Sequence, residues 1–162
     1  MAKRQEVEDV QQNEELEEMN LNSEITLKTH DMINSRYSGD LDELKDGYAK
    51  VSLMTNEEMR VDSYGLVHGG FIFCASDFAA MAAVNDPNVV LAAATTSFLS
   101  PVRVGDEVVF EAKVRHKDGR KREVNVTGSV LEIKVFEGAF KTVVLDKHVL
   151  KLDLMNASKS EF

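Results

Sequence analysis

The sequence predicts an α+β fold in which a curved antiparallel sheet of about five or six strands wraps around one long central helix. The helix is predicted from residues 65–85, GLVHGGFIFCASDFAAMAAVN, which are almost wholly apolar and small after the glycine pair. The sheet is predicted because apolar and polar residues alternate with a period of two beyond Pro87, in runs joined by short turns. Small residues along the helix suit close wrapping by such a sheet.

The size and charge of the chain restrict the classes of protein to which it can belong. At 162 residues it is long enough for one domain with a core of its own. Residues 1–46 hold 13 acidic and 5 basic residues, whereas the rest is close to neutral within a net charge of −9. Nucleic acid and membrane surfaces are therefore not expected as partners.

The sequence also predicts a cytoplasmic protein. No apolar run approaches the roughly 20 residues that span a bilayer, and the first residues lack the apolar core of a signal peptide. Cys74 is the only cysteine in the sequence, so it has no partner for an internal disulfide, which favours a reducing compartment.

The chain divides into four parts by composition. Residues 1–22 are predicted to be an acidic, flexible segment, with a helix that docks on a protein partner as the alternative. Residues 23–46 are predicted to form a short helix over 23–34 and then a turn-rich lead-in. Residues 47–152 form the predicted domain, and residues 153–162 a C-terminal tail.

Within the predicted domain, strands flank the helix. Alternation in GYAKVSLM predicts a strand before it, followed by a polar connector at residues 55–65. The helix is expected to end before Pro87, because proline cannot continue it. Strands follow in the runs that begin near Val89, Glu107, Arg122 and Lys134, and HVLKL at residues 148–152 is expected to extend the last of them.

One set of motifs resembles a known family. The sequence His68-Gly69-Gly70, with Asp77 in the helix and Ser100-Pro101-Val102 closing a strand, resembles the hotdog-fold acyl-CoA thioesterases of the PaaI type. The resemblance covers about residues 45–150. It implies the hotdog fold, a homodimer or a higher oligomer built from it, and acyl-CoA as the ligand, with no other cofactor.

Residues 65–140 also resemble the effector domain of FapR, a transcription factor that senses malonyl-CoA without hydrolysing it. The resemblance implies that the arginine holding the malonyl carboxylate would fall at His68, and its partner asparagine at Asp77. Both positions are therefore enzyme-like. Residues 1–44 are too acidic and too poorly patterned for the DNA-binding helix-turn-helix of such a regulator.

The residues themselves suggest how a thioester could be hydrolysed. The N–H of Gly69, with that of Gly70, could donate to the thioester oxygen, because a glycine-led helix start exposes free N–H groups. Asp77 could act as base or nucleophile, and a structural acid hydrogen-bonded to Thr95, Thr96 or a backbone amide is the alternative. Eight residues separate Gly69 from Asp77, or about 12 Å along one helix. A catalytic pair would therefore need two subunits.

Further candidates surround this pair. His68 is a candidate catalytic base, or it braces the loop, and Tyr64 is a candidate for the acyl entrance. Asp62 stands where many PaaI-type enzymes carry asparagine, and a second acid there would raise the pKa of Asp77 or repel its charge.

Coenzyme A phosphates are expected to bind a basic hairpin, residues 115–124, with a solvated hairpin tip as the alternative. The basic residues assigned to the phosphates are Arg120, Lys121 and Arg122. No metal site is expected, because the histidines are scattered.

Two function classes stay open. One is a homodimeric thioesterase that hydrolyses an acyl-CoA, and the other is a regulatory protein that binds acyl-CoA without turnover. The aspartate at position 62 leaves open whether the protein is an enzyme.

Overall fold

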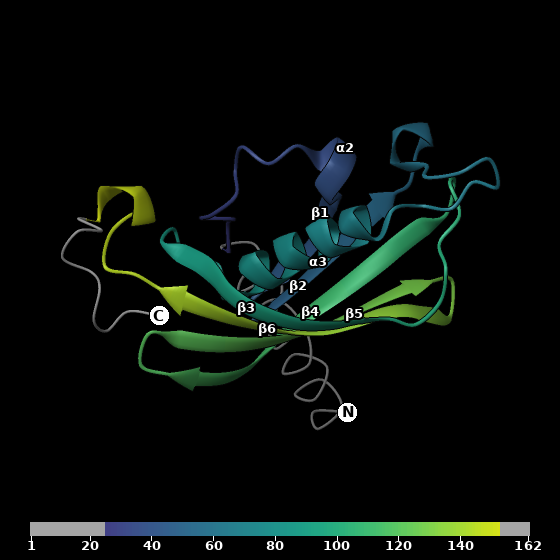
Figure 1. The fold of residues 1–162 in the computed structure, drawn as a ribbon. Helices are drawn as coiled ribbons and strands as arrows, with labels where there is room; N and C mark the ends of the chain where they lie inside the picture. The colour runs from purple at the N-terminus through teal and green to yellow at the C-terminus, as the bar shows by residue number, and fades with distance from the viewer. Residues whose placement is uncertain (1–24, 153–162) are drawn as a thin grey trace, which may run out of the picture.

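The central helix and the sheet around it are both present in the computed structural model, which describes residues 25–152 (Figure 1). The elements are α2 (Ser35–Ser38), β1 (Asp40–Lys45), β2 (Tyr48–Met54), a 3-10 turn (Glu57–Met59), α3 (Gly69–Val84), β3 (Val89–Phe98), β4 (Glu107–Asp118), β5 (Lys121–Val130), β6 (Ile133–Val144) and a second 3-10 turn (Val149–Lys151). The predicted α+β architecture is confirmed. The segments predicted at residues 1–22 and 153–162 lie outside the described residues.

The six strands form one antiparallel sheet in the order β1-β2-β4-β5-β6-β3. Short hairpins join β4 to β5 and β5 to β6, so these strands follow one another in the sheet as they do along the chain. The strand β3 is the exception, because it precedes β4 along the chain but pairs with β6. As a result β3 lies at one edge of the sheet, with a strand on one side only.

The long helix α3 lies in the concave face of the sheet and packs mainly against β2, β4 and β5. Its last residue is Val84, after which Asn85 takes a left-handed conformation (φ 52°) and donates its N–H to the Met81 carbonyl. The predicted end before Pro87 is confirmed. No helix among residues 25–152 has the length and apolarity to cross a membrane.

Aromatic side chains of the sheet fill the space under α3. Phe110, Phe136 and Phe140 are completely buried. Two glycines on neighbouring strands make room for them, since a Cβ on Gly128 would lie 2.8 Å from the Phe110 ring and one on Gly138 2.8 Å from the Phe140 ring. Burying each phenylalanine stabilises the fold by about 1.5–3 kcal/mol.

The helix predicted at residues 23–34 is wrong over its described part, because residues 25–34 contain no helix. Their backbone bonds instead go to the end of α3: Asn85 Nδ2 donates to the Thr26 carbonyl (2.9 Å), and Lys28 N–H donates to Asn85 Oδ1 (2.7 Å). The ring of His30 stacks on Phe78 of α3, with 6.3 Å between centroids. Tertiary contacts thus outweigh the local helical pattern.

Two further segments differ from the prediction. The segment predicted as turn-rich contains α2 and β1, so the sheet begins at Asp40. β1 pairs with β2 along its length, with a register shift between Leu41 and Glu43, and its partly buried Leu41 and Leu44 pack on the core. At the other end, the predicted strand extension at residues 148–152 is a 3-10 turn, in which His148 Nδ1 accepts from the Leu150 N–H (3.2 Å).

Candidate functional site

The turn into α3 is shaped by His68, whose side chain caps the helix. Its Nδ1 atom accepts a hydrogen bond from the Gly70 N–H over 2.7 Å. A Cβ on Gly70 would lie only 2.7 Å from that same nitrogen, so the cap leaves room for glycine alone. The imidazole thus holds the start of the helix and occupies the Gly70 N–H, which was a candidate donor to substrate.

Gly69 is the first residue of α3, and its N–H is free. No hydrogen bond joins that N–H to any of the described residues. Nothing nearby requires a glycine either, because an added Cβ would lie 3.4 Å from the Phe98 ring, an ordinary contact. The first N–H groups of a helix carry partial positive charge. Gly69 therefore offers an unused donor on a surface that a ligand can approach closely.

Asp62 shapes the loop before α3. Its Oδ1 atom accepts from the N–H groups of Tyr64 (2.9 Å) and Leu66 (3.1 Å), as in an Asx turn. The side chain of Tyr64 is 87% exposed at the tip of that loop. Asp62 makes no contribution to the raised pKa of Asp77 within one protomer, because burial is the cause of that shift.

Asp77 is a half-buried carboxylate in the middle of α3. Its Oδ1 atom is buried and has no hydrogen-bond partner among the described residues. Burial raises the pKa of this carboxyl from 3.8 to about 6, because a charge is poorly solvated there. The alternative of a structural acid bonded to Thr95 or Thr96 is therefore wrong for the single protomer. Such unpaired acids are concentrated at functional sites.

Gly69 and Asp77 share one side of α3, together with Phe73 between them. Residues four and eight apart lie on the same helix face. This side is directed toward β6 and β3, because the Phe73 ring packs on Phe140 of β6 with 5.7 Å between centroids, and Gly69 lies beside Phe98 of β3. Gly69 and Asp77 are nevertheless about 12 Å apart along the helix. Within one protomer they do not reach the same atom.

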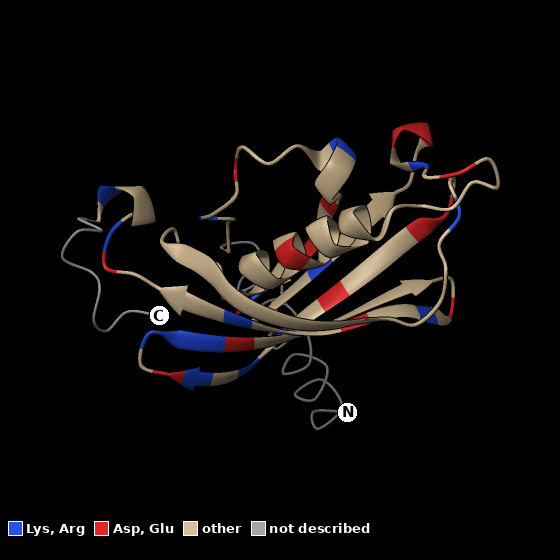
Figure 2. Cartoon of the chain, viewed as in Figure 1, with Lys and Arg blue, Asp and Glu red and all other residues tan. Residues whose placement is uncertain are grey.

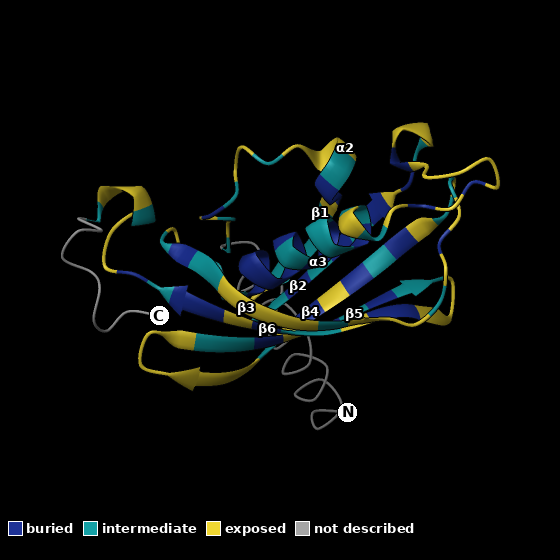
Figure 3. Cartoon of the chain, viewed as in Figure 1, coloured by how far each residue is buried: buried dark blue, intermediate teal, exposed yellow. Residues whose placement is uncertain are grey.

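The part of the sheet next to this side of α3 is exposed, with no other described element packed on it. Ala94, Thr96 and Phe98 of β3 pair with buried or inward-facing residues of β6, so they point to the concave face that holds α3. Ala94 and Phe98 are nevertheless exposed, Phe98 to 54%. Figure 3 shows exposed residues along the middle of β3. This exposure could not be predicted from the sequence, because the strand carries the same alanines and threonines as a buried one.

Basic side chains gather at the β4–β5 hairpin, as predicted from the sequence (Figure 2). The three candidate phosphate ligands do not all lie in one place, however. Arg120 pairs with Asp146, whereas Lys121 and Arg122 both line a groove of about 430 Å³ together with His116 and Lys141.

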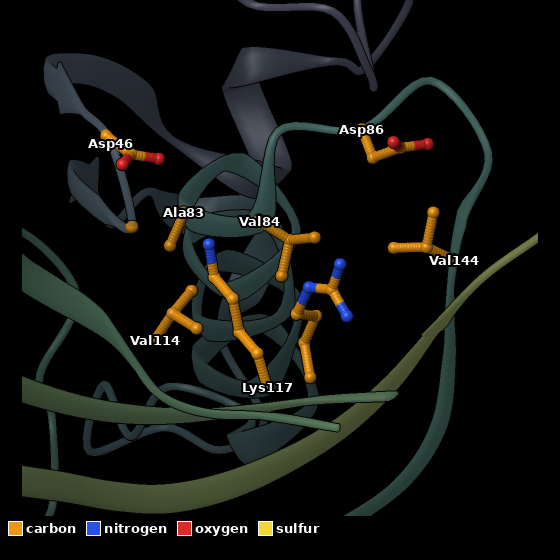
Figure 4. A pocket seen from close by; sticks show the side chains of 9 residues that line it. Asp46, Ala83, Val84, Asp86, Val114, Lys117 and Val144 are labelled. Carbon is orange, nitrogen blue, oxygen red and sulfur yellow. The ribbon is translucent and has the colours of Figure 1, made fainter. Parts of the chain in front are cut away.

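Arg122 also reaches the concave side of the sheet. Its Nη1 donates to the carbonyls of Gly119 (2.7 Å) and Lys121 (2.9 Å). With Lys117, another basic residue of the predicted hairpin, it lines a small pocket at the C-terminal end of α3 (Figure 4). The negative end of the helix dipole favours cations there.

The described residues contain no cluster of His, Cys, Asp and Glu that could hold a metal ion. Cys74, in α3, contacts the Ser38 hydroxyl of α2 at 3.2 Å.

Comparison with known proteins assigns the chain to a family. Residues 64–135 match the family model described as the Thioesterase superfamily. The crystal structure of an uncharacterized protein from Pyrococcus horikoshii, 46% identical, superposes with a TM-score of 0.77 over 78% of this chain and 97% of that chain. The chain belongs to the thioesterase superfamily. Its curved sheet around one long helix is the hotdog fold of that superfamily, and the resemblance seen in the sequence is confirmed.

The chain spans only part of the length of the curated relatives that it matches. Part of methylthioribose-1-phosphate isomerase from Aquifex aeolicus is 52% identical over 119 residues, which are 74% of this chain and 26% of the isomerase. Transcription factor FapR from Caldanaerobacter subterraneus is 29% identical over 76% of this chain and 62% of FapR. A Streptococcus mutans protein bound to acetyl CoA, 21% identical, shares the fold with a TM-score of 0.65, over 74% of this chain and 97% of that chain.

Proposed function

We propose that the protein is a homodimer that binds acyl-CoA and hydrolyses its thioester, with each site formed across the subunit interface. The observation that carries the proposal is Asp77. A half-buried carboxylate, whose buried Oδ1 has no hydrogen-bond partner among residues 25–152, lies on the same side of α3 as the free Gly69 N–H, yet about 12 Å away. The adjoining face of β3 is bare, which is the expected state of a surface that a second copy covers.

The spacing along α3 and β3 defines how two copies would meet. Gly69 lies beside Phe98 at the end of β3. A shift of about 12 Å along α3 corresponds to three or four strand residues, so Asp77 is about level with Ala94 or Thr95. If the unpaired edge of β3 meets its own copy about a two-fold axis near Thr96, Gly69 of one protomer comes level with the partner's Asp77.

Such a pair has the groups that thioester hydrolysis needs. The Gly69 N–H would donate to the thioester oxygen as negative charge develops on it. With a pKa of about 6, Asp77 is ionised at neutral pH. As a base it would take a proton from water while the water oxygen bonds to the carbonyl carbon. The C–S bond then breaks, and the coenzyme A sulfur takes up the proton.

Direct attack by Asp77 is the other route. The carboxylate oxygen would bond to the carbonyl carbon as the thiolate leaves, and water would then cleave the resulting anhydride. Both routes need the carboxylate and the Gly69 donor. His68 would contribute by capping α3 and holding that donor in place.

Coenzyme A would lie with its phosphates toward the basic hairpin. In the antiparallel pairing described above, the C-terminal end of the partner's helix adjoins the N-terminal end of α3, so the partner's hairpin approaches Gly69. Lys121 and Arg122 are the candidate phosphate ligands, and Arg120 would have to exchange its contact with Asp146. The acetyl CoA bound by the Streptococcus mutans protein of the same fold supports this class of ligand.

A regulatory protein that binds acyl-CoA without turnover is the second candidate. The FapR relatives favour it, because FapR is described as a transcription factor and shares 29% of residues over the matched region. In that function the acidic segment at residues 1–22 would meet a protein partner. An unpaired carboxylate at Asp77 supports the enzyme instead.

The test is release of free coenzyme A from a panel of acyl-CoAs, followed with a thiol reagent. Wild-type protein should release it, Asp77→Asn should bind acyl-CoA without releasing it, and the control Asp42→Asn, on the opposite edge of the sheet, should match the wild type. Saturable binding with no release from any substrate would support the regulatory protein. Equal rates for Asp77→Asn and wild type would contradict the proposal.

A further inference from the structure

A cavity of about 260 Å³ opens beside Gly69 at the N-terminal end of α3. Its deeper walls are Ile72 of α3, Val102 after β3 and Val135 of β6, all of which are buried. Phe98, which is 54% exposed, stands at the rim. The cavity therefore runs from the surface at Gly69 into the apolar interior.

We propose that this cavity binds the acyl group of the thioester and selects uncharged, apolar acyl groups of up to about ten carbon atoms. The inference rests on the proposed function and specifies its substrate. Gly69 lines the cavity and also carries the free N–H donor. A carbonyl oxygen that accepts from this N–H stands at the cavity mouth, so one substituent of the carbonyl carbon enters the cavity. The other substituent, the sulfur, leads out along the surface.

The lining excludes charged acyl groups. No Lys, Arg, His, Asp or Glu side chain lines the cavity in the described part of the chain. The carboxylate of a dicarboxylic acyl group, such as succinyl, would lose its hydration there and meet no cation. Apolar carbon gains from the same move, because its surface leaves water. Selection against dicarboxylic acyl groups therefore follows from the wall chemistry alone.

The volume limits the length of the chain. A cavity of about 150 Å³ is known to hold benzene, so at the same packing 260 Å³ holds about ten carbon atoms. A two-carbon acetyl group would leave most of the cavity empty. A sixteen-carbon chain would have to displace Ile72, Val102 or Val135 from the core. Chains such as hexanoyl and octanoyl, or a phenylacetyl group, fit best.

The test is titration calorimetry of the full-length Asp77→Asn protein with coenzyme A, acetyl-CoA, octanoyl-CoA, palmitoyl-CoA and succinyl-CoA. We expect octanoyl-CoA to bind at least about tenfold more tightly than the other four. Ser100→Phe, which places a ring in the cavity from its loop wall, should remove this preference. The control Leu99→Phe, next to it but outside the lining, should keep the preference.

The possible outcomes separate this inference from the proposed function. Equal affinity for octanoyl-CoA and succinyl-CoA, or octanoyl-CoA binding that Ser100→Phe leaves intact, would overturn the cavity assignment alone. Failure of every acyl-CoA to bind would overturn the proposed function as well. If Ser100→Phe does not fold, the affinities of the Asp77→Asn protein for octanoyl-CoA and succinyl-CoA still test the cavity assignment. Weaker dimers in Ser100→Phe with unchanged octanoyl-CoA binding would show that a second copy fills the cavity instead.

Discussion

The Nδ1 atom of His68 accepts a hydrogen bond from the Gly70 N–H over 2.7 Å and thereby caps the central helix. His68→Ala should lower the free energy of unfolding by about 1 kcal/mol, as loss of a helix cap generally does, and His68→Asn should restore most of it. Urea denaturation measures both. If His68 acts only as a cap, His68→Asn should also keep most of the hydrolysis rate. A rate as low as that of His68→Ala would instead assign it to the chemistry.

Gly69→Pro tests the donor directly. Proline suits the first position of a helix, His68 already has the extended conformation that precedes proline (φ −61°, ψ 127°), and the lost N–H makes no hydrogen bond in the protomer. The variant should be as stable as wild type or about 0.5 kcal/mol more stable. Thioester hydrolysis should nevertheless fall by about 100-fold, the usual effect of losing an oxyanion donor.

Gly69→Ala is the matched control, because it keeps the N–H and adds only a methyl group at ordinary contact distance from Phe98. Its hydrolysis rate should lie well above that of Gly69→Pro. Equal rates for the two variants would mean that the substrate needs the space at Gly69 and not its N–H.

Asp77 should make the protein less stable as the pH rises. Folding raises the pKa of its carboxyl from 3.8 to about 6, so the native state binds the proton more tightly than the unfolded state. Its contribution is therefore fully present below about pH 4 and is lost as the pH rises through 6. The loss amounts to as much as about 3 kcal/mol.

Asp77→Asn cannot ionise, so at pH 7.5 it should be more stable than wild type, and at pH 4 the two should be similar. Urea denaturation of both proteins at the two pH values provides the measurement. A difference between them that stays constant with pH would contradict the raised pKa. A gain in stability with a loss of activity is the usual behaviour of a functional residue.

The sequence predicted the parts of this fold that local pattern determines. Alternation located β2 and the strands after Pro87, and the glycine pair with Asp77 located the helix and its candidate site. The pattern was insufficient where distant contacts decide. Residues 25–34 have a helical spacing of apolar residues, but their backbone groups bond to Asn85, more than 50 positions away. Likewise, nothing in the alternation of β3 indicates that it is an edge strand.

The site was predicted to the same extent. The spacing of Gly69 and Asp77 along one helix follows from the sequence alone. The occupation of the Gly70 N–H by His68 does not, nor does the divergence of Arg120 and Arg122 at the hairpin. These depend on side-chain directions, and in a strand a shift of one residue in register would turn every side chain to the other face of the sheet.

The bare inner face of β3 predicts how the oligomer can be broken. Thr96→Arg would place a charge at the centre of the proposed pairing, and should convert the dimer to monomer and abolish hydrolysis together. Asn125→Arg, on the exposed convex side of β5, is the control and should change neither. Sedimentation velocity reports the mass, and the thiol assay the activity. A fully active monomer would contradict a site shared between subunits.

Mixing two inactive variants gives the most direct test of that sharing. Gly69→Pro lacks the donor, and Asp77→Asn lacks the carboxylate, so each homodimer should be inactive. In a mixed dimer, one of the two sites combines the Gly69 donor of the Asp77→Asn chain with Asp77 of the Gly69→Pro chain, and this site is intact. Random exchange makes half of all dimers mixed, so activity should recover to about a quarter of the wild-type value. A double variant with both changes in one chain, mixed with wild type, is the control. If each site combines Gly69 of one chain with Asp77 of the other, these mixed dimers hold no intact site. If both groups of a site come from the same chain, they hold one. Mixed single variants that stay inactive, with exchange verified by mass spectrometry, would mean that Gly69 and Asp77 of different subunits do not act on the same thioester.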